Sequence, residues 1–366
     1  MPARACWSDS KSDARLLKTE ADTAPGVAGF NLAGFNTLSI PAIAERFIEV
    51  TTPEQLREEL ASLQASGLQP ALILGGGSNV VLTQPRYPVV LHLQMKGIRF
   101  RGDGHVTVAA GENWHGFVER TLEHKCYGLE NLALIPGSCG AAPIQNIGAY
   151  GVEIGEFVTA VRAMHRQSGE IRSFSADECR FAYRDSYFKG PEGRQWIILS
   201  LDLQLRTQAR LNLAYPELAA AWAAQSEWLN ESELQIADEA QRLARVVAAL
   251  RRYKLPDPAV TPNSGSFFKN PIVDAQRFED LQMRWPGIVG YPLAGGQVKL
   301  AAGWLIDRAG HKGSVSGGVG LHHRQALVLV NPGRCSGAAV LDFASRIQQD
   351  IARHFAVNLE IEPDQY

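Results

Sequence analysis

The chain has 366 residues, of which 45% are apolar and 20% are charged. A chain of this length buries a sizeable core and divides into two or three domains. The net charge is −2 without a basic block, which argues against nucleic-acid binding. No apolar run approaches the ~20 residues that span a membrane. Five cysteines without a CxxC pair indicate a reducing cytoplasm rather than a disulfide framework or a zinc site.

The first half of the chain predicts an extension, a helix and a glycine-rich connection between strands. Residues 1–34 mix charges and lack the apolar stretch of a signal peptide, so we expect a loosely ordered extension. A helix is predicted from Thr52, its N-cap, to Gly67, with Leu56, Leu60 and Leu63 on its apolar face. A strand at 71–74, three glycines and an apolar segment at 79–82 follow.

The rest of the chain predicts four further elements and a boundary. We expect a helix at 114–125, a half-buried strand at 196–205, one long helix from about 231 to 253, and a last helix at 337–355. Three prolines in "KLPDPAVTPNSG" prevent any regular element from crossing that run, so we expect a domain boundary near Leu255. Short strands interleaved with a few helices predict an α+β fold.

The glycine cluster in "ILGGGSNVVL" exposes backbone N–H groups that can approach a phosphate closely. Neither a P-loop lysine nor the spacing of the dinucleotide fingerprint is present, and a β-like run follows instead of a helix. One hypothesis is therefore a strand–loop–strand that binds pyrophosphate through backbone amides. A tight hairpin with Ser78 and Asn79 at its turn fits this motif equally well.

A second segment of small residues, "IPGSCGAAPIQNIGAYG", is nearly free of charge. Taken alone, a buried irregular connection is the favoured interpretation. Two such segments in one chain favour a bound dinucleotide, because both offer backbone that a large flat ligand can approach.

Six segments in this order carry a resemblance: "LILGGGSN", "AGENWHGFVERTLEHKCYGLENLALIPGSCGAAPIQNIGAYGVE", "ECRFAYRDSYFK", "RRYKLPDP", "GSFFKNP" and "VKLAAGWLID". From about Phe35 to Glu362 the chain resembles the UDP-N-acetylenolpyruvoylglucosamine reductase family, in its longer form with an extra loop near Tyr215. The resemblance implies an α+β protein with an FAD-binding lobe of the vanillyl-alcohol-oxidase type at 35–255 (subdomains about 35–100 and 101–255). It also implies a substrate domain at 256–354 and a C-terminal segment, 355–366, that returns to the active site.

The resemblance implies that FAD is bound without a covalent bond. Gly75, Gly76, Gly77, Ser78 and Asn79 would cradle its pyrophosphate, Pro143, Ile144, Gln145, Asn146, Ile147, Gly148, Ala149 and Tyr150 would line the flavin, and Arg251 would add a charge nearby. Cys139 is the one side chain in these loops that suggests covalent attachment, and we interpret it as a packing residue.

The implied reaction is NADPH-dependent reduction of the enol ether of UDP-N-acetylglucosamine enolpyruvate to UDP-N-acetylmuramate, in peptidoglycan precursor synthesis. Reduction pushes negative charge into the substrate carboxylate, which requires a cation there and an acid at the α-carbon. The resemblance assigns the cation to Arg184, a guanidinium suited to bidentate carboxylate contacts, and the acid to Ser266. From the residues alone, two alternative interpretations remain open: Arg184 forms only an ion pair with Asp185, and Ser266 is only an ordinary turn hydroxyl.

Glu362 is the third candidate catalytic residue, and it must be protonated or act through water; burial that raises its pKa would be the physical sign. The family continues from this glutamate into Val-Arg and an apolar stretch, whereas this chain reads "PDQY". The register of Phe355 and Leu359 favours Glu362, with Glu360 as the alternative and a solvated tail as a third interpretation.

The remaining implied substrate contacts come from both lobes. Tyr183 packs beside Arg184. The pyrophosphate and sugar are held by Tyr215, Lys254 and Asn270, and the uracil is recognised by Gln325. Lys254 could equally serve as a cation at a helix C-terminus. His322 and His323 lack a third ligand at useful spacing, so no metal is expected.

Two other functions compete with the reductase. One is an oxidase of the same fold that uses oxygen on an alcohol or lactone, and the other is a flavin-loaded, inactive protein that senses a UDP-sugar. We expect a cytoplasmic monomer that takes NADPH and substrate in one pocket and has no nucleic-acid or membrane partner.

Overall fold

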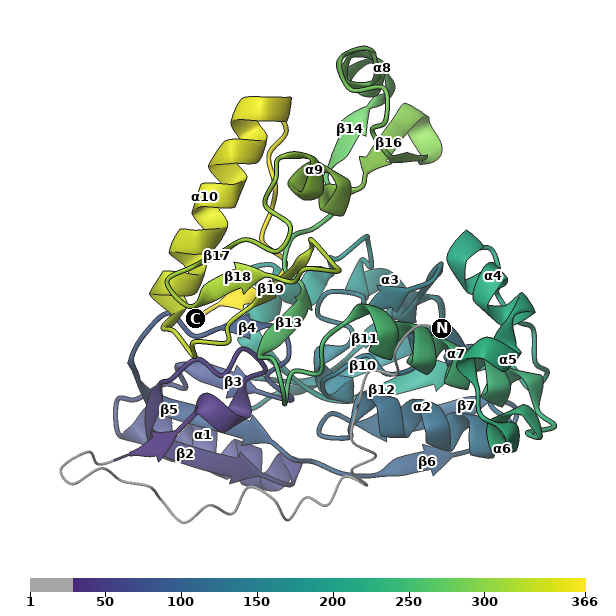
Figure 1. Ribbon diagram of the computed structural model, residues 1–366. Helices are drawn as coiled ribbons and strands as arrows, with labels where there is room; N and C mark the ends of the chain where they lie inside the picture. Colours follow the sequence, from purple (N-terminus) through teal and green to yellow (C-terminus); the bar gives the residue numbers. More distant parts are fainter. Residues whose placement is uncertain (1–28) are drawn as a thin grey trace. The chain divides into compact units, whose positions relative to one another are not determined.

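The computed structural model describes residues 29–366 (Figure 1). Residues 1–28 of the predicted extension, including Cys6, lie outside the described residues. The described chain forms two compact units. Unit 1 contains residues 44–77 and 87–253, and unit 2 contains residues 29–43, 78–86 and 254–366.

Unit 1 carries most of the larger sheet structure and one long helix. Its elements, two of which begin and one of which ends a residue outside the unit, are β2 (Ile43–Val50), α1 (Pro53–Ala65), β3 (Leu72–Leu74), β5 (Arg86–Leu93), β6 (Ile98–Phe100), β7 (His105–Ala109), α2 (Trp114–Glu123), β8 (Gly148–Ala149), β9 (Val152–Glu153), β10 (Val158–His165), β11 (Ile171–Ser175), α3 (Ala176–Cys179), β12 (Trp196–Gln204), α4 (Pro216–Ala223), α5 (Gln225–Trp228), α6 (Glu231–Leu234) and α7 (Glu239–Lys254). Short 3-10 turns lie between them: η2 (Glu130–Leu132), η3 (Cys139–Ala141), η4 (Ile154–Glu156), η5 (Tyr187–Lys189) and η6 (Gly193–Gln195).

Unit 2 combines short strands with three helices. Its elements are β1 (Phe30–Asn31), η1 (Ala33–Phe35), β4 (Val80–Val81), β13 (Asn263–Ser266), β14 (Ile272–Asp274), α8 (Ala275–Arg284), β15 (Gly290–Pro292), η7 (Ala294–Gly296), β16 (Gln297–Leu300), α9 (Ala302–Arg308), β17 (Val315–Ser316), β18 (Val319–Leu321), β19 (Val328–Val330), α10 (Gly337–Phe355) and β20 (Asp364–Gln365). None of the described helices combines the length and apolar character of a membrane span.

The centre of unit 1 is an antiparallel sheet with strand order β11-β10-β12-β7-β6. Strand β12 separates two apolar cores: Ile198 and Leu201 join the residues of α2 and α7, whereas Ile197 and Leu199 join those of α1 and β5. The predicted strand is therefore confirmed, but its first half is buried on both faces instead of one.

Three predicted helices are confirmed, and in the structure each begins at a side-chain cap, of which Thr52 is the one predicted from the sequence. The side chain of Thr52 accepts a hydrogen bond from the Gln55 N–H at the start of α1, whose buried side chains are Leu56, Leu60 and Leu63. Helix α2 is capped in the same way by Asn113 and ends at Glu123, two residues earlier than expected. Helix α10 has the predicted bounds, is capped by Ser336, and buries Val340, Phe343, Ile347 and Ile351.

The single long helix predicted from about 231 to 253 is wrong. The chain forms α6 and α7, with a break between Leu234 and Glu239. One carboxylate oxygen of Asp238 accepts hydrogen bonds from the N–H groups of Ala240 and Gln241, so this residue starts a new helix. The other oxygen accepts a hydrogen bond from the Tyr127 hydroxyl at 2.8 Å, which fixes the break to the core of unit 1.

The hairpin interpretation of the glycine cluster is also wrong. Strand β3 pairs in parallel with β5, and β4 pairs in parallel with β20 at the end of the chain, so the two segments that flank the glycines do not pair with each other. The N–H and hydroxyl of Thr83 both donate to the carbonyl oxygen of Tyr366, which closes this small sheet of unit 2. The connection is a strand–loop–strand.

Unit 2 contains two antiparallel sheets, ordered β13-β19-β18-β17 and β14-β16-β15. Figure 1 shows α10 running beside β17 and β18, and its apolar face is buried in this unit. Both ends of β13 are paired with β19, through Asn263 with Val330 and Ser266 with Val328. This pairing fixes the backbone on which Ser266 stands.

Candidate functional site

The glycine-rich loop packs directly against the second small-residue segment in unit 1. A Cβ atom on Gly75 would lie 2.2 Å from Ser138 Oγ, and one on Gly76 would lie 2.6 Å from Gly137 Cα. At Gly76 the close atoms belong to backbone, so this position requires glycine, whereas at Gly75 the Ser138 hydroxyl could rotate away from an added Cβ. Gly77 adopts a φ of 61°, in the left-handed region that favours glycine. The arrangement fits a loop that presents bare backbone to a phosphate group.

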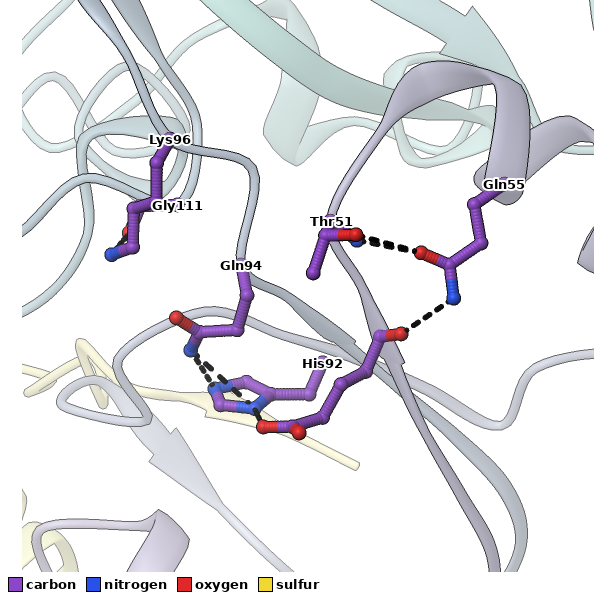
Figure 2. A network of polar contacts seen from close by, with 7 residues as sticks. Thr51, Gln55, His92, Gln94, Lys96 and Gly111 are labelled. Carbon is purple, nitrogen blue, oxygen red and sulfur yellow. Dashed lines mark hydrogen bonds and ion pairs between the residues drawn. The ribbon is translucent and has the colours of Figure 1, made fainter. Parts of the chain in front are cut away.

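His92 and Gln94 belong to a network of polar contacts near the glycine-rich loop (Figure 2). His92 of β5 pairs with Leu74 in the parallel ladder, and its Nε2 lies 2.8 Å from the Gln94 amide nitrogen. Burial lowers the pKa of His92, although the Glu49 carboxylate and a hydrogen bond with the Gly75 backbone act in the opposite direction. A side chain of β5 therefore helps to hold the first glycine.

The predicted flavin-lining segment begins as a series of turns and ends in the hairpin of β8 and β9. Tyr150 and Gly151 form its turn, with φ angles of 49° and 80°. Left-handed backbone is costly for a tyrosine, so its surroundings must hold it in place. Pro143, Asn146 and Ile147 are buried, whereas Ile144, Gln145, Gly148, Ala149 and Tyr150 are half-buried.

Tyr183 and Arg184 form a two-residue turn that docks on this segment. Reciprocal backbone hydrogen bonds of 3.1 Å between Ala182 and Asp185 close the turn, and Arg184 has a φ of 54°. Arg184 Nη2 donates to the Gly148 carbonyl at 3.0 Å, and the Ser186 hydroxyl donates to the Ile144 carbonyl at 2.7 Å. The side chains of Arg184 and Ser186 thereby hold the turn against the loop.

Asn146 adds a buried link between the two segments. Its amide nitrogen donates to Glu153 Oε2 at 2.6 Å and to the Ala182 carbonyl at 3.0 Å, and its Oδ1 accepts from the Gly155 N–H at 2.9 Å. Only 2% of Asn146 is exposed. Its side chain is thus engaged within the protein, and its part in building the site is to hold the Arg184 turn.

The charges near this turn favour an anion. Burial lowers the pKa of Arg251, and the nearby charge of Arg184 lowers it further, although a guanidinium remains protonated in proteins. Arg251 Nε donates to the Leu134 carbonyl at 3.3 Å. Burial raises the pKa of Tyr150 to about 12, and its ring packs edge-on against that of Tyr215 with centroids 5.4 Å apart. Two arginines and two aromatic rings therefore lie near the turn of the β8–β9 hairpin.

In unit 2 the structure brings Ser266 and Glu362 to neighbouring positions of paired backbone. Phe268 pairs with Ile361, and the N–H of Glu362 donates to the carbonyl of Phe267 at 2.9 Å. Ser266 precedes Phe267 directly and is half-buried. A hydroxyl and a carboxyl thus stand on adjacent segments of the same unit.

Burial separates the two candidate glutamates. Glu362 is 8% exposed. The side chain of Glu360 is 68% exposed, and its Oε1 forms an ion pair with Lys269 Nζ at 2.5 Å. Of the two carboxylates, only Glu362 is shielded from solvent.

The other predicted substrate residues of unit 2 lie near helix α9 or at the start of the unit. Asn270 Oδ1 accepts a hydrogen bond from the Ala302 N–H at 2.9 Å and so holds the first residue of α9. A Cβ on Gly303 of the same helix would lie 3.6 Å from Gln325 Oε1. Lys254 is the last residue of α7 and the first of this stretch of unit 2.

Two residues singled out in the sequence have structural settings of their own. Cys139 is fully buried in the core of unit 1, and burial raises its pKa well above the ordinary value. His322 lies against His323 with ring centroids 4.5 Å apart, and burial lowers its pKa to about 4. Among residues 29–366, no group of three or more His, Cys, Asp or Glu side chains is placed to hold a metal ion.

Sequence reasoning missed four residues that build the site: Asn131, Ser138, Ser186 and Asn212. Ser138 meets Gly75, Ser186 holds the Arg184 turn, and the two asparagines bind the Tyr150 turn. Each acts on backbone far away in sequence. The one available signal was that Asn131, Ser138 and Ser186 lie in segments that carry the resemblance; Asn212 lies outside them.

The loops and the sheets that carry them define a flavoprotein. Residues 44–175 match the FAD binding domain family, and residues 257–366 match the family described as UDP-N-acetylenolpyruvoylglucosamine reductase, C-terminal domain. The predicted fold class, an FAD-binding lobe combined with a smaller α+β lobe, is confirmed by these two matches.

Curated relatives extend the match over nearly the whole chain. The UDP-N-acetylenolpyruvoylglucosamine reductase of Pseudomonas fluorescens Pf-5 is 45% identical over 93% of this chain and 98% of its own. That of Paraburkholderia phymatum is 45% identical over 94% of this chain and 99% of its own. A crystal structure of the reductase from Thermus caldophilus, at 24% identity, superposes with a TM-score of 0.64 over 93% of this chain and 98% of that chain, which shows the fold.

The chain belongs to the UDP-N-acetylenolpyruvoylglucosamine reductase family, FAD-dependent oxidoreductases that use NADPH in peptidoglycan precursor synthesis. The predicted family, enzyme class and cofactor are confirmed. Membership in this family replaces the alternatives of an oxygen-using oxidase and of a flavin-loaded sensor.

Proposed function

We propose that the protein reduces the enol ether of UDP-N-acetylglucosamine enolpyruvate with NADPH, and that its own residues divide the work between cofactor binding, carboxylate binding and proton delivery. Bound FAD supplies the electron transfer between NADPH and the enol ether. Residues 35–255 form the cofactor lobe, residues 256–354 the substrate domain, and residues 355–366 contribute Glu362. The protein works as a cytoplasmic monomer, and NADPH and the substrate use one pocket in turn.

The observation that carries the proposal is the Arg184 turn. A non-glycine residue in left-handed backbone is strained, and such strain persists where the surroundings over-determine it, as at binding sites. Hydrogen bonds from Arg184, Ser186 and Asn146 hold this turn against the segment that lines the flavin in our proposal. Arg184 then binds the substrate carboxylate, where its charge stabilises the negative charge that reduction creates.

Ser266 donates the proton to the α-carbon of the substrate. A serine hydroxyl is a weak acid, but a carbanion-like intermediate is a strong base, so transfer between correctly placed atoms is favourable. Glu362, buried and one position away across the paired backbone, supports this step in its protonated form or through water. The exposed, ion-paired Glu360 has no part in the proposal.

The remaining assignments concern binding. Gly75, Gly76, Gly77, Ser78 and Asn79 hold the FAD pyrophosphate, while the segment from Pro143 to Tyr150 and Arg251 contact the flavin. Tyr183 packs beside the carboxylate site. The sugar and pyrophosphate of the substrate are held by Tyr215, Lys254 and Asn270, and the uracil is recognised by Gln325.

The test of proton donation separates the two half-reactions in the Ser266→Ala variant. We expect NADPH to reduce the bound flavin at the wild-type rate, whereas reoxidation by the enol-ether substrate slows by roughly 100-fold or more. The matched control is Ser264→Ala on the same strand, because the buried Ser264 hydroxyl makes no hydrogen bond in the described part of the chain. Equal loss of both half-reactions in Ser266→Ala would contradict the proposal.

A further inference from the structure

Asn131 lies on the short turn η2, between two residues of the core of unit 1. It is 1% exposed, and its neighbours Leu129 and Leu132 are fully buried. A polar side chain in such a position requires a reason, because burying an amide costs free energy unless it is hydrogen-bonded.

The amide nitrogen of Asn131 supplies that reason. It donates to the carbonyl oxygen of Tyr150 at 2.9 Å and to the carbonyl oxygen of Asn212 at 2.9 Å. Its Oδ1 makes no hydrogen bond within residues 29–366. The residue is therefore present for its two donors, and both go to backbone from segments 19 and 81 residues away.

The two carbonyls belong to the segments that carry Tyr150 and Tyr215. The β8–β9 hairpin holds Tyr150 through its own backbone pairs. The stretch from Leu211 to Ala214 has no regular structure. Leu211 and Leu213 pack on the core of unit 1, and the stretch is tied to the Tyr150 turn through the Asn131 contact and through Asn212, whose amide nitrogen donates to the Gly151 carbonyl at 3.2 Å.

Tyr215 comes at the end of that stretch and is the N-cap residue of α4. Its ring meets the ring of Tyr150 at 5.4 Å, nearly perpendicular. Loss of the Asn131 donors would leave the hairpin intact and loosen the irregular stretch, which would keep its core packing and the Asn212 hydrogen bond. The consequence would fall on Tyr215 and therefore on binding of the substrate.

We propose that Asn131 is a positioning residue for substrate binding, which clamps the stretch that carries Tyr215 to the turn that carries Tyr150. The inference rests on the proposed function, because that function assigns Tyr215 to the substrate. No group on Asn131 touches the reacting atoms in this account.

The experiment replaces Asn131 by aspartate, which has the same shape and turns the donor into an acceptor. At neutral pH we expect the KM for the enol-ether substrate to rise roughly tenfold or more, because two carbonyls lose their donor. The kcat at saturating substrate and the FAD content should stay near the wild-type values. Asn113→Asp is the matched control, because the Asn113 side chain acts as the acceptor that caps α2 and aspartate caps equally well.

The pH profile distinguishes positioning from a loss of folding. Burial raises the pKa of the new carboxyl group above ~4, so lowering the pH protonates it and restores one donor. The KM of Asn131→Asp should therefore return towards the wild-type value as the pH falls. The neighbouring ionisable groups, Glu130 on the same turn, Arg251 on α7 and Glu217 on α4, are common to both proteins, so the wild-type profile measured at each pH is the reference.

A second variant keeps the test decisive if Asn131→Asp does not fold. Asn212→Asp, at a half-buried position, retains the acceptor for the Ala214 N–H and loses the donor to Gly151, so it should raise the KM in the same direction. A wild-type KM in Asn131→Asp, or in Asn212→Asp where the first variant is unfolded, overturns the inference. So does a parallel loss of FAD, kcat and thermal stability. A wild-type holoenzyme that does not turn over the substrate contradicts the proposed function instead.

Discussion

The meeting of Gly76 with Gly137 offers the sharpest test of the cofactor loop. In Gly76→Ala, the new methyl group would lie 2.6 Å from Gly137 Cα and 3.0 Å from the Gly137 carbonyl carbon. Ordinary carbon–carbon contacts are about 3.5–4.0 Å, so the two backbones must separate by roughly 1 Å. Neither partner is a flexible side chain that could rotate away.

The cost of such overpacking is about 1–3 kcal/mol. If the separation displaces the loop from its FAD-binding position, the same free energy appears as a roughly 5- to 150-fold rise in the Kd for FAD. The assay is titration of flavin-free protein with FAD, followed by the change in flavin fluorescence, together with denaturant unfolding of the flavin-free protein.

The control is Gly116→Ala in helix α2. Its Cβ would lie 3.6 Å from the nearest atom, Asn113 Oδ1, and alanine favours a helix by up to about 1 kcal/mol relative to glycine. This variant should bind FAD as the wild type does. The reasoning is refuted if Gly76→Ala also binds FAD with the wild-type Kd and unfolds at the wild-type denaturant concentration.

Three further predictions address the Arg184 turn, the C-terminal carboxylate and the Tyr150 ring. Asn146→Ala removes three buried hydrogen bonds and should lower the free energy of unfolding by about 2–4 kcal/mol in a denaturant titration, and an unchanged midpoint would contradict its linking role. Glu362→Gln should slow reoxidation of reduced flavin by the substrate, whereas Glu360→Gln should not, and the reverse order in stopped-flow traces would exchange their roles. The pKa of Tyr150 is raised to about 12 in the folded protein, so its contribution to stability is present below pH ~10 and is lost as the pH rises towards 12. Tyr150→Phe should therefore show a shallower loss of stability over that interval, and identical slopes would exclude this linkage.

Local signals in the sequence predicted local structure well. Thr52 was predicted to be a helix N-cap, and the structure uses the same chemistry there, a side-chain oxygen that accepts a backbone N–H. The break before α7 was missed because a charged residue such as Asp238 is equally compatible with the exposed face of a continuous helix. Its role as a cap depends on Tyr127, more than 100 residues away.

The residue types of the site could be predicted from the sequence, but the long-range contacts that hold them in place could not. The glycines of the loop were recognised as bare backbone, but that Gly76 faces Gly137 is a long-range contact that no spacing rule contains. The same holds for Asn131, whose two donors serve carbonyls from separate segments. The choice between Glu362 and Glu360 depends on burial, which only the folded chain reveals.

The most direct test of the proposed activity is a single-turnover experiment on the purified holoenzyme. The protein is reduced with NADPH in the absence of oxygen until the yellow flavin colour disappears, and UDP-N-acetylglucosamine enolpyruvate is then added. We predict prompt return of the oxidised flavin spectrum together with formation of UDP-N-acetylmuramate. A flavin that NADPH does not reduce, or one that recovers its colour only when oxygen is admitted, would contradict the account.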